Sequence, residues 1–354
     1  MDEIVSETIG YVKPLCPVFD ECGGCAYQNI SYSDELKIKQ QRVTHTLHDL
    51  LAINPAVIQP IVPSPKEYHY RHRLDLRLLK TKEQKIFIGF SPKDRFGVVD
   101  VNQCAIAMES VSDFIPRLKE EVAKMLPAKY RLANLVVRCG QDGRLQWGGV
   151  GKGSLNLKEE NYLWVEIEGR KVFYSLDTFF QANLSILPVL FRRIRQLDLW
   201  SDDTVFYDLY GGVGLFTLGL LGSYSKSYLI EDCKNSINLA NYNVQYHRLD
   251  HVHVVEGRVE DHLDGLLANE PGQAVAMIDP PRAGLTPAAC ELISGQEKFG
   301  SIFYLSCNPE ALARDLKYFL RKGWAIQTVI PFDFFPKTKH IETFVWLKQL
   351  KEQG

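Results

Sequence analysis

The chain has 354 residues, of which 45% are hydrophobic and 24% charged, and its formal net charge at pH 7 is −2. Such a chain can form two or three domains, and no apolar stretch reaches the roughly 18 residues that a membrane span requires. The first ten residues contain three acidic side chains rather than the basic stretch of a targeting signal. We therefore expect a cytoplasmic protein without a membrane partner, and the near-neutral charge excludes a general positive field.

Eight cysteines are too few and too unevenly placed for a disulfide scaffold. Cys16, Cys22 and Cys25 form a C-x₅-C-x₂-C pattern, and Cys104 lies far downstream. Three thiolates on one loop with a distant fourth suit a 4Fe-4S cluster, although zinc accepts the same ligands. Because the protein fills all four positions, no iron is left open to a substrate, and we expect a structural or redox-sensing role.

The first half of the chain predicts two units. An irregular lead-in with the cysteine-rich loop is followed by a polar helix over residues 32–51 and by a proline-rich linker. From about residue 70 to 173, apolar and polar residues alternate as in antiparallel strands, and a helix near 111–126 interrupts them. We predict an iron–sulfur loop and helix over 1–60 and a central α+β domain over 61–172.

The pattern changes after residue 173, where apolar strands alternate with helices. This alternation is typical of a parallel sheet with helical crossovers. Seven strands are expected, over residues 204–209, 227–230, 252–255, 274–278, 301–305, 325–329 and 343–347. We predict an α/β fold, in which a Rossmann-like seven-strand domain over 173–354 follows the α+β domain and the small iron–sulfur region.

Basic side chains gather beside aromatic residues in three places, over 68–80, 192–195 and 337–340. A single group of this kind is usually a solvated face. Three groups that flank one crevice would form a groove that follows a phosphate backbone. In the central domain we expect Arg71, Arg73 and Arg77 to make such contacts, unless they pair with acidic neighbours.

A glycine-rich loop follows the first strand of the C-terminal domain, at residues 208–214 (Asp-Leu-Tyr-Gly-Gly-Val-Gly). Glycines there let the backbone approach a ligand closely. The spacing departs from the G-x-G-x-x-G of dinucleotide sites, and the second strand ends in Glu231, whose carboxylate can accept both ribose hydroxyls. These features favour S-adenosylmethionine over NAD, although Glu231 could equally be a capping or solvated turn acid.

Two further motifs follow neighbouring strands, Asp-Pro-Pro-Arg at 279–282 and Ser-Cys-Asn-Pro at 306–309. In a doubly wound sheet, reactive groups sit at the carboxyl ends of the strands, where the ligand crevice opens. Cys307 is therefore a candidate nucleophile, because a thiolate attacks an electron-poor ring carbon and can leave again. Taken alone, it could also be a buried core cysteine.

Seven motifs stand in order along the chain: Cys-x₅-Cys-x₂-Cys-x-Tyr-Gln at 16–28, Tyr-Arg-x-Arg at 70–73, Phe-Phe-Gln-x-Asn at 179–183, the loop at 208–214, Asp-Pro-Pro-Arg-x-Gly at 279–284, Ser-Cys-Asn-Pro at 306–309 and His-x-Glu at 340–342. Together they resemble the RNA uracil-5 methyltransferase family, whose members depend on S-adenosylmethionine and contain an iron–sulfur cluster. The chain is most similar to the short bacterial branch that methylates 23S ribosomal RNA. Many relatives carry an N-terminal TRAM domain, and we expect it to be missing, since fifteen residues precede Cys16.

The resemblance implies a role for each matched position. Cys307 would be the nucleophile, and Glu342 the base that removes the ring proton. The residues of the S-adenosylmethionine pocket would be Gln181, Tyr210, Glu231 and Asp279. The ligands of a 4Fe-4S cluster would be Cys16, Cys22, Cys25 and Cys104. The central domain would bind the RNA substrate, and we expect a monomer. The chain departs from many relatives at Gly211, where they have cysteine, which touches the shape of the pocket rather than the chemistry.

The chemistry requires such groups independently of the family. Carbon 5 of uracil is too poor a nucleophile to take a methyl group from a sulfonium, but addition of a thiolate to carbon 6 turns the ring into an enolate that can. The adduct must then lose its carbon-5 proton to a positioned base before the thiolate leaves. A base in structured RNA must first flip out of its stack, and Phe179 or Phe180 could hold it, although at least one of them is expected in the core.

Three alternatives stay open. The substrate could be transfer RNA methylated at uridine 54 rather than 23S ribosomal RNA. The enzyme could instead methylate an amino nitrogen, although Arg282 stands where such enzymes usually have an aromatic residue. The third alternative is a cluster-bearing RNA-binding protein without catalysis, which the presence of both Cys307 and Glu342 argues against.

Overall fold

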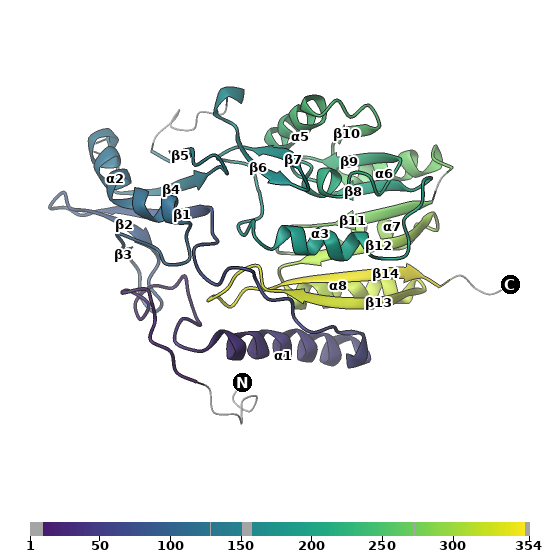
Figure 1. Cartoon of the computed structure of the whole chain (residues 1–354), viewed down its shortest axis with the longest axis horizontal. Helices are drawn as coiled ribbons and strands as arrows, with labels where there is room; N and C mark the ends of the chain where they lie inside the picture. The colour runs from purple at the N-terminus through teal and green to yellow at the C-terminus, as the bar shows by residue number, and fades with distance from the viewer. Residues whose placement is uncertain (1–9, 128, 151–157, 272, 351–354) are drawn as a thin grey trace.

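The computed structural model describes residues 10–127, 129–150, 158–271 and 273–350 (Figure 1). Within them the chain forms a five-stranded sheet, a seven-stranded sheet and a two-stranded hairpin. A long helix, α1 (Tyr32–Leu51), lies below the seven-stranded sheet in the view of Figure 1. None of the helices in this part of the chain combines the length and the apolar content that a membrane crossing needs.

The helix α1 begins at a capping serine and packs through an apolar stripe. Ser31 Oγ accepts a hydrogen bond from the amide of Asp34 at 3.1 Å, which satisfies one free donor of the first turn. Val43 and Leu47 are buried in the same hydrophobic cluster as residues of the seven-stranded sheet. The short 3₁₀ helix η1 (Pro55–Val57) follows. The predicted helix is confirmed, and its packing joins it to the C-terminal half of the protein.

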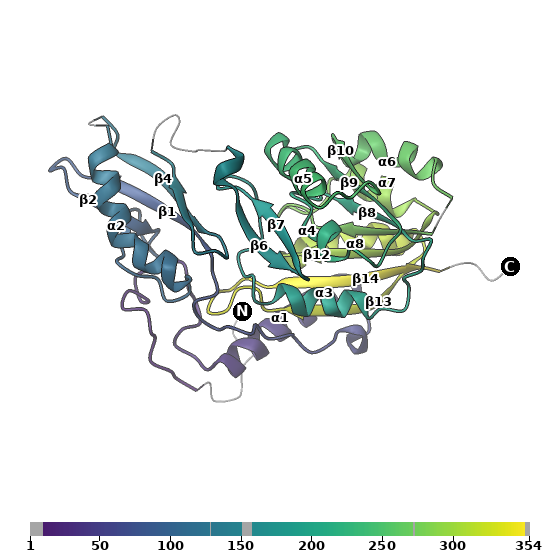
Figure 2. The ribbon, with the colours of Figure 1, turned by 45° about the horizontal axis from the view of Figure 1, so that its top comes forward.

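The central sheet is antiparallel, with the strand order β3-β2-β1-β4-β5. Its strands are β1 (Arg73–Lys80), β2 (Ile86–Phe90), β3 (Val99–Asp100), β4 (Leu132–Cys139) and β5 (Leu145–Gly148). Side chains alternate along β1, so that Leu74, Leu76 and Leu78 are buried while Asp75 and Arg77 are exposed. The buried face packs against α2 (Glu109–Met125), which lies along one side of the sheet in Figure 2.

A hairpin of β6 (Leu163–Ile167) and β7 (Arg170–Tyr174) follows the 3₁₀ helix η2 (Glu159–Asn161). Val165 and Val172 are buried in one cluster with Phe206 and Phe303, which belong to the seven-stranded sheet. The predicted boundary at 172/173 therefore divides residues that pack together, because alternation along a strand does not reveal which core the strand joins. We propose that the C-terminal unit begins before the hairpin.

The seven-stranded sheet has the order β10-β9-β8-β11-β12-β14-β13, and within it only β14 runs antiparallel to its neighbours. Its strands are β8 (Val205–Leu209), β9 (Lys226–Glu231), β10 (Val252–Glu256), β11 (Ala274–Ile278), β12 (Phe299–Ser306), β13 (Trp324–Phe332) and β14 (Glu342–Gln349). The helices beside it are α3 (Leu187–Arg195), α4 (Leu215–Gly219), α5 (Lys234–Tyr246), α6 (Val259–Ala268), α7 (Pro287–Ser294) and α8 (Pro309–Arg321). All seven predicted strands are present, and the last three are longer than expected because backbone pairing continues beyond their apolar centres.

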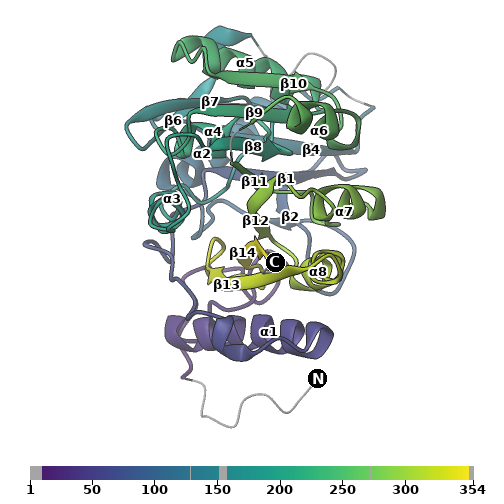
Figure 3. The ribbon, with the colours of Figure 1, turned by 90° about the vertical axis from the view of Figure 1, so that its right-hand side faces the viewer.

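Two hydrophobic clusters lie on the two faces of this sheet. Because side chains alternate along a strand, Phe206 belongs to one cluster and Tyr207 to the other. The β6–β7 hairpin, α3 and α4 contribute to the first cluster, and α1, α6, α7 and α8 to the second. Figure 3 shows α3 on one side of the sheet and α7 and α8 on the other. The predicted α/β fold with a Rossmann-like domain is confirmed, and the carboxyl ends of its parallel strands point toward the central sheet (Figure 1).

Candidate active site

Strand register brings three of the predicted pocket residues to one edge of the seven-stranded sheet. Leu209, the last residue of β8, pairs with the residue before Glu231 on one side and with the residue before Asp279 on the other. Tyr210 follows Leu209 directly, so Tyr210, Glu231 and Asp279 lie side by side where the parallel strands end. Ligands of open α/β sheets bind at this carboxyl edge.

The predicted nucleophile and base lie on neighbouring antiparallel strands. Ser306, the last residue of β12, pairs with Thr343 of β14. The next position along this ladder therefore holds Cys307 on one strand and Glu342 on the other. Cys307 is half-buried, and Glu342 is buried, with 4% of its surface exposed. A thiol and a carboxyl group thus lie next to each other at the same edge.

The residues after Cys307 are held by the cap of α8. Asn308 Oδ1 accepts hydrogen bonds from the amides of Glu310 at 3.2 Å and Ala311 at 3.3 Å. Asn308 Nδ2 also donates to the backbone carbonyl of Arg282 at 3.3 Å. The asparagine therefore ties the motif that carries Cys307 to the motif that carries Asp279.

Burial controls the protonation of the groups at this edge. It raises the pKa of Glu342 well above that of an ordinary glutamate, and the charge of Asp279 raises it further. The pKa of Asp279 rises to about 7 through burial, and a hydrogen bond from Gln181 opposes the rise. The pKa of Cys307 rises to about 11 through burial and through the charges of Glu342 and Asp279, while Arg282 acts against them. The edge disfavours further negative charge, so a bound cation would stabilise it.

A side chain at Gly211 has no room in this protein. A Cβ there would lie 2.5 Å from Cγ of Leu229 and 3.1 Å from Cγ of Asp208. Leu229 on β9 fills the space that a side chain at residue 211 would need. Sequence reasoning could not find this close approach, because the two residues meet only when β8 and β9 pair.

Glu231 is held by the glycine-rich loop and by its own turn. Its Oε2 accepts a hydrogen bond from the amide of Gly212 at 2.9 Å, and its Oε1 accepts one from the amide of Cys233 at 2.8 Å. A cavity of about 170 Å³ opens beside it, lined in part by Tyr210 and Arg258. The carboxylate thus caps the turn, as one interpretation expected, and it also borders a cavity.

Gln181 reaches this edge from the segment before α3. It is buried, and its Nε2 donates to Oδ2 of Asp279 at 3.4 Å. Its backbone carbonyl contacts Nε2 of His72 at 2.9 Å, and burial lowers the pKa of this histidine to about 3, so the ring is neutral. Of the two neighbouring aromatic residues, Phe180 is buried in the core whereas 67% of Phe179 is exposed. Phe179 is therefore the ring that is free to meet a base.

The four cysteines predicted as cluster ligands line one cavity of about 220 Å³, together with His340, which lies two residues before Glu342. Burial raises the pKa of Cys25 to about 12 and that of Cys104 to about 11. Both thiols lie near enough to other cysteines for their charges to add to these shifts, and a metal group would reverse them. Among the described residues, no three His, Cys, Asp or Glu side chains are arranged to hold a metal ion.

Sequence reasoning missed two buried residues that shape the site. Asp208 is fully buried, its pKa rises to about 7 through burial, and the hydroxyl and amide of Thr217 donate to its Oδ2 at 2.6 Å and 2.9 Å. Arg138, at the end of an apolar run in the central sheet, is also fully buried, and its Nη1 donates to the carbonyls of Ser175 at 2.5 Å and Thr178 at 2.8 Å. Arg138 thereby holds the segment that carries Gln181. In the sequence, the only sign that these two residues are buried is that each is a charged residue in an apolar run.

A buried ion network supports the loop that precedes Glu342. Lys39 Nζ lies 2.7 Å from Oδ1 of Asp333 and 2.7 Å from Oε1 of Glu35 on its own helix. Lys337 Nζ lies 3.0 Å from Oε2 of Glu67, and Lys337 is 2% exposed. The expectation that the basic group at 337–340 faces a phosphate backbone is therefore wrong for Lys337, whose charge is neutralised inside the protein.

Known proteins were compared with this chain in sequence and in structure. The family model described as tRNA (uracil-5-)-methyltransferase matches residues 151–350. An uncharacterized RNA methyltransferase from Synechocystis is 27% identical, over 98% of this chain and 84% of its own length. The 23S rRNA (uracil(1939)-C(5))-methyltransferase RlmD from Haemophilus parainfluenzae is 27% identical, over 96% of this chain and 84% of its own length.

Among solved structures, the tRNA (uracil-54, C5)-methyltransferase from Pyrococcus abyssi, in complex with S-adenosyl-L-homocysteine, superposes with a TM-score of 0.71 at 23% identity. The match covers 92% of this chain and 86% of that one, and it supports the fold. The predicted enzyme class, an RNA methyltransferase, is confirmed by the family match and by the relatives. With more than half of its residues matched by the family model, the chain belongs to the tRNA (uracil-5-)-methyltransferase family.

Proposed function

We propose that this enzyme transfers a methyl group from S-adenosylmethionine to carbon 5 of a uridine in RNA through a covalent adduct of Cys307. The observation that carries this proposal is that Cys307 and Glu342 directly follow and precede the paired residues Ser306 and Thr343, close enough for the charge of Glu342 to raise the pKa of Cys307. Methylation of an amino nitrogen needs neither a thiol nor a base in this arrangement. An RNA-binding protein without catalysis would have no use for the pair.

Cys307 must lose its proton before it attacks carbon 6 of the ring. Its pKa of about 11 means that the thiol form dominates at neutral pH in the free enzyme. Arg282 is the protein charge that favours the thiolate. S-adenosylmethionine supplies the methyl group and, as a sulfonium, a positive charge that would favour the thiolate further.

Glu342 is proposed as the base that removes the carbon-5 proton after methylation. Burial raises the pKa of Glu342, and a carboxylate with a raised pKa is a stronger base than that of an ordinary glutamate. When Glu342 takes the proton, the electrons of the carbon–hydrogen bond restore the ring double bond and the Cys307 thiolate leaves. Enzyme and methylated uridine are then separate again.

The pocket for S-adenosylmethionine is proposed to use Gln181, Tyr210, Glu231 and Asp279. Glu231 presents a carboxylate that loop amides orient, which suits a ribose with two hydroxyls. Asp279 and its partner Gln181 lie between this carboxylate and the Cys307 strand, since β11 stands between β8 and β12. The methyl donor and the uracil ring would then meet between Glu231 and the end of the strand that precedes Cys307.

The proposed substrate is 23S ribosomal RNA, with transfer RNA as the alternative. The relative from Haemophilus parainfluenzae is named for the first substrate, and the structure from Pyrococcus abyssi for the second. Mapping of 5-methyluridine in both RNAs from a deletion strain would decide between them. Loss of one ribosomal methylation supports the first proposal, and loss at transfer RNA position 54 supports the second.

The covalent mechanism is tested with RNA that contains 5-fluorouridine. Fluorine at carbon 5 cannot leave as a proton, so Glu342 has nothing to remove and the adduct persists. We expect a protein–RNA band on a denaturing gel for the wild type and none for Cys307→Ala. Wild-type protein that methylates RNA without forming such a band would exclude the adduct.

A 4Fe-4S cluster is proposed for the cavity between the N-terminal loop and the central sheet, held by Cys16, Cys22, Cys25 and Cys104. Four thiols line this one cavity, and a 4Fe-4S cluster needs four soft ligands of this kind. Iron, sulfide and zinc analysis of anaerobically purified protein tests this proposal, and a zinc-loaded, colourless protein would contradict it. Cys22→Ser should remove the brown absorbance and lower the melting temperature.

A further inference from the structure

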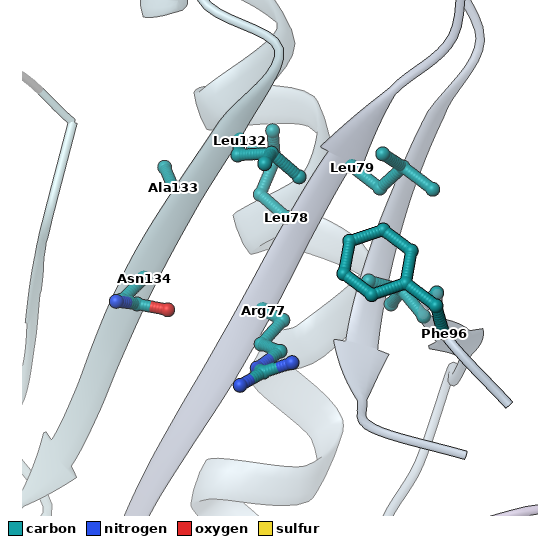
Figure 4. Close-up of a pocket in the computed structure, with 9 residues that line it drawn as sticks. Arg77, Leu78, Leu79, Phe96, Leu132, Ala133 and Asn134 are labelled. Carbon is teal, nitrogen blue, oxygen red and sulfur yellow. The ribbon is translucent and has the colours of Figure 1, made fainter. Parts of the chain in front are cut away.

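A cavity of about 350 Å³ opens on the central sheet, and its residues come from β1, β4 and the loop before β3 (Figure 4). Arg77 pairs directly with Asn134 across β1 and β4, and Phe96 of the loop lies beside them. Leu132 adds an apolar wall. Arg77 alternates with the buried leucines of β1, so this cavity lies on the face turned away from α2.

Several side chains around this cavity are exposed, and Arg77 has no side-chain partner in the described ranges. Phe96 is 86% exposed and Leu132 is 58% exposed. No ion pair or side-chain hydrogen bond joins Arg77 to another residue in the described ranges, whereas Arg73 on the same strand lies 2.8 Å from Asp75. An exposed aromatic ring beside an unpaired guanidinium indicates a surface that meets a partner.

The same face of the sheet continues to the active site. Arg73 pairs across the strands with Arg138, and Arg73 Nη1 donates to the carbonyl of Thr178 at 3.4 Å. Thr178 directly precedes the exposed Phe179, and Gln181 follows two residues later. Arg77 lies four residue steps along the extended strand from Arg73, a distance of about 13 Å. An RNA strand that leaves the active site past Phe179 can reach the cavity within a few nucleotides.

We propose that this cavity binds a second, unstacked base of the RNA substrate, held on Phe96 and flanked by Arg77 and Asn134. The inference rests on the proposed RNA methylation and adds a recognition site outside the reacting pocket. Phe96 supplies a face for stacking, and Arg77 a cation for the neighbouring phosphate. The Asn134 amide has both donors and an acceptor, so it can pair with the edge of a base.

The chemistry of the cavity favours RNA over a protein partner. The chain as a whole carries a net charge of −2, so RNA affinity has to come from local, unpaired cations such as Arg77. The buried Lys337 and the paired Arg73 no longer count among the basic groups that the sequence suggested. Arg77, the exposed ring of Phe96 and Phe179 then lie along one path on this face.

Binding of a labelled short oligouridylate to the full-length protein tests this proposal. Phe96→Ala should weaken the affinity about tenfold, which corresponds to about 1.4 kcal/mol. Phe96→Trp should keep the affinity, and the extra fluorescence of this variant should be quenched by the oligonucleotide. Two matched controls should bind as the wild type does: Tyr11→Ala removes another exposed aromatic ring, and Arg117→Ala removes an exposed arginine from α2.

Unchanged affinity of Phe96→Ala, or unquenched fluorescence of Phe96→Trp, would overturn the proposal. Methylation of total RNA from a deletion strain separates this failure from failure of the proposed function. If the wild type forms 5-methyluridine and Phe96→Ala binds normally, the second base site is wrong and the enzyme activity stands. If no RNA is methylated but Phe96→Ala still loses affinity, the base site stands without the activity.

Discussion

At the carboxyl edge of the seven-stranded sheet, Asp208 and Glu342 are buried and lie close to the half-buried Asp279, whereas on the central sheet Arg77 and Phe96 are exposed to solvent. Burial moves the pKa values of the first group and leaves little freedom to change a side chain. Exposure leaves the side chains of Arg77 and Phe96 accessible to a partner. The edge is suited to catalysis and the open face to recognition. Substitutions at the edge should therefore change turnover or stability, and substitutions on the open face should change RNA binding.

The largest effect is expected from Cys307→Ala at the buried edge. Without the thiol, carbon 5 of the ring is not activated, so methyl transfer should fall by at least about 10³-fold. Binding of S-adenosylhomocysteine, measured by calorimetry, should change little because the thiol acts on the base. Cys233→Ala removes an exposed cysteine and should behave as the wild type. Turnover by Cys307→Ala at a rate close to that of the wild type would rule out the covalent mechanism.

Glu342→Gln should lower turnover by about 10²- to 10⁴-fold, since an amide cannot accept the carbon-5 proton. Methylation itself can still occur, so the variant should accumulate a protein–RNA adduct that is visible on a denaturing gel. Glu310→Gln, which changes an exposed glutamate at the start of α8, is the matched control. If Glu342→Gln turns over at the wild-type rate, another group is the base.

Asp279→Asn tests the effect of the carboxyl edge on stability, measured as melting temperature, rather than on activity. The folded pKa of Asp279, about 7, lies above the ordinary value of 3.8, so its contribution to stability is complete at low pH and is lost as pH rises through about 7. The melting temperature of the ligand-free wild type should therefore fall between about pH 4 and pH 7, the interval between the unfolded and folded pKa values. Over the same pH range, the free energy of unfolding should fall less in the variant than in the wild type, by up to about 4 kcal/mol. Each kcal/mol corresponds to about 2 to 4 °C in melting temperature.

Thermal unfolding of both proteins across this pH range checks the prediction. Asp202→Asn, at an exposed position, should follow the wild type at every pH. If the melting temperature of Asp279→Asn changes with pH as that of the wild type does, ionisation of Asp279 does not destabilise the folded protein.

The smallest effects are expected on the open face, where substitutions of Arg73 and Arg77 should have different effects. Arg73 lies 2.8 Å from Asp75 and donates to the carbonyl of Thr178, so Arg73→Ala should lower the melting temperature. Arg77→Ala should leave the melting temperature unchanged and flatten the salt dependence of RNA binding by about 0.7, the value for one contact with single-stranded RNA. Equal melting temperatures together with an unchanged salt slope for Arg77→Ala would remove this face from the RNA path.

The sequence by itself determined the seven strands after residue 204, the helix over residues 32–51 and the motifs that end the strands. These features are local, because alternation, capping residues and glycine spacing act over a few neighbouring positions. From them the carboxyl edge and the candidate pair Cys307 and Glu342 could be named before any contact was known. The resemblance to a methyltransferase family rested on the same motifs, and the family match confirms it.

Only the tertiary structure decided which charged residues are buried. Lys337 belongs to a group that the sequence suggested as a basic surface, and Arg138 to a stretch in which apolar and polar residues alternate, yet both lie inside the protein with partners distant in sequence. The space at Gly211 is likewise filled by Leu229 from another strand. Burial and pairing depend on contacts between segments far apart in the chain, and a local pattern carries no record of them.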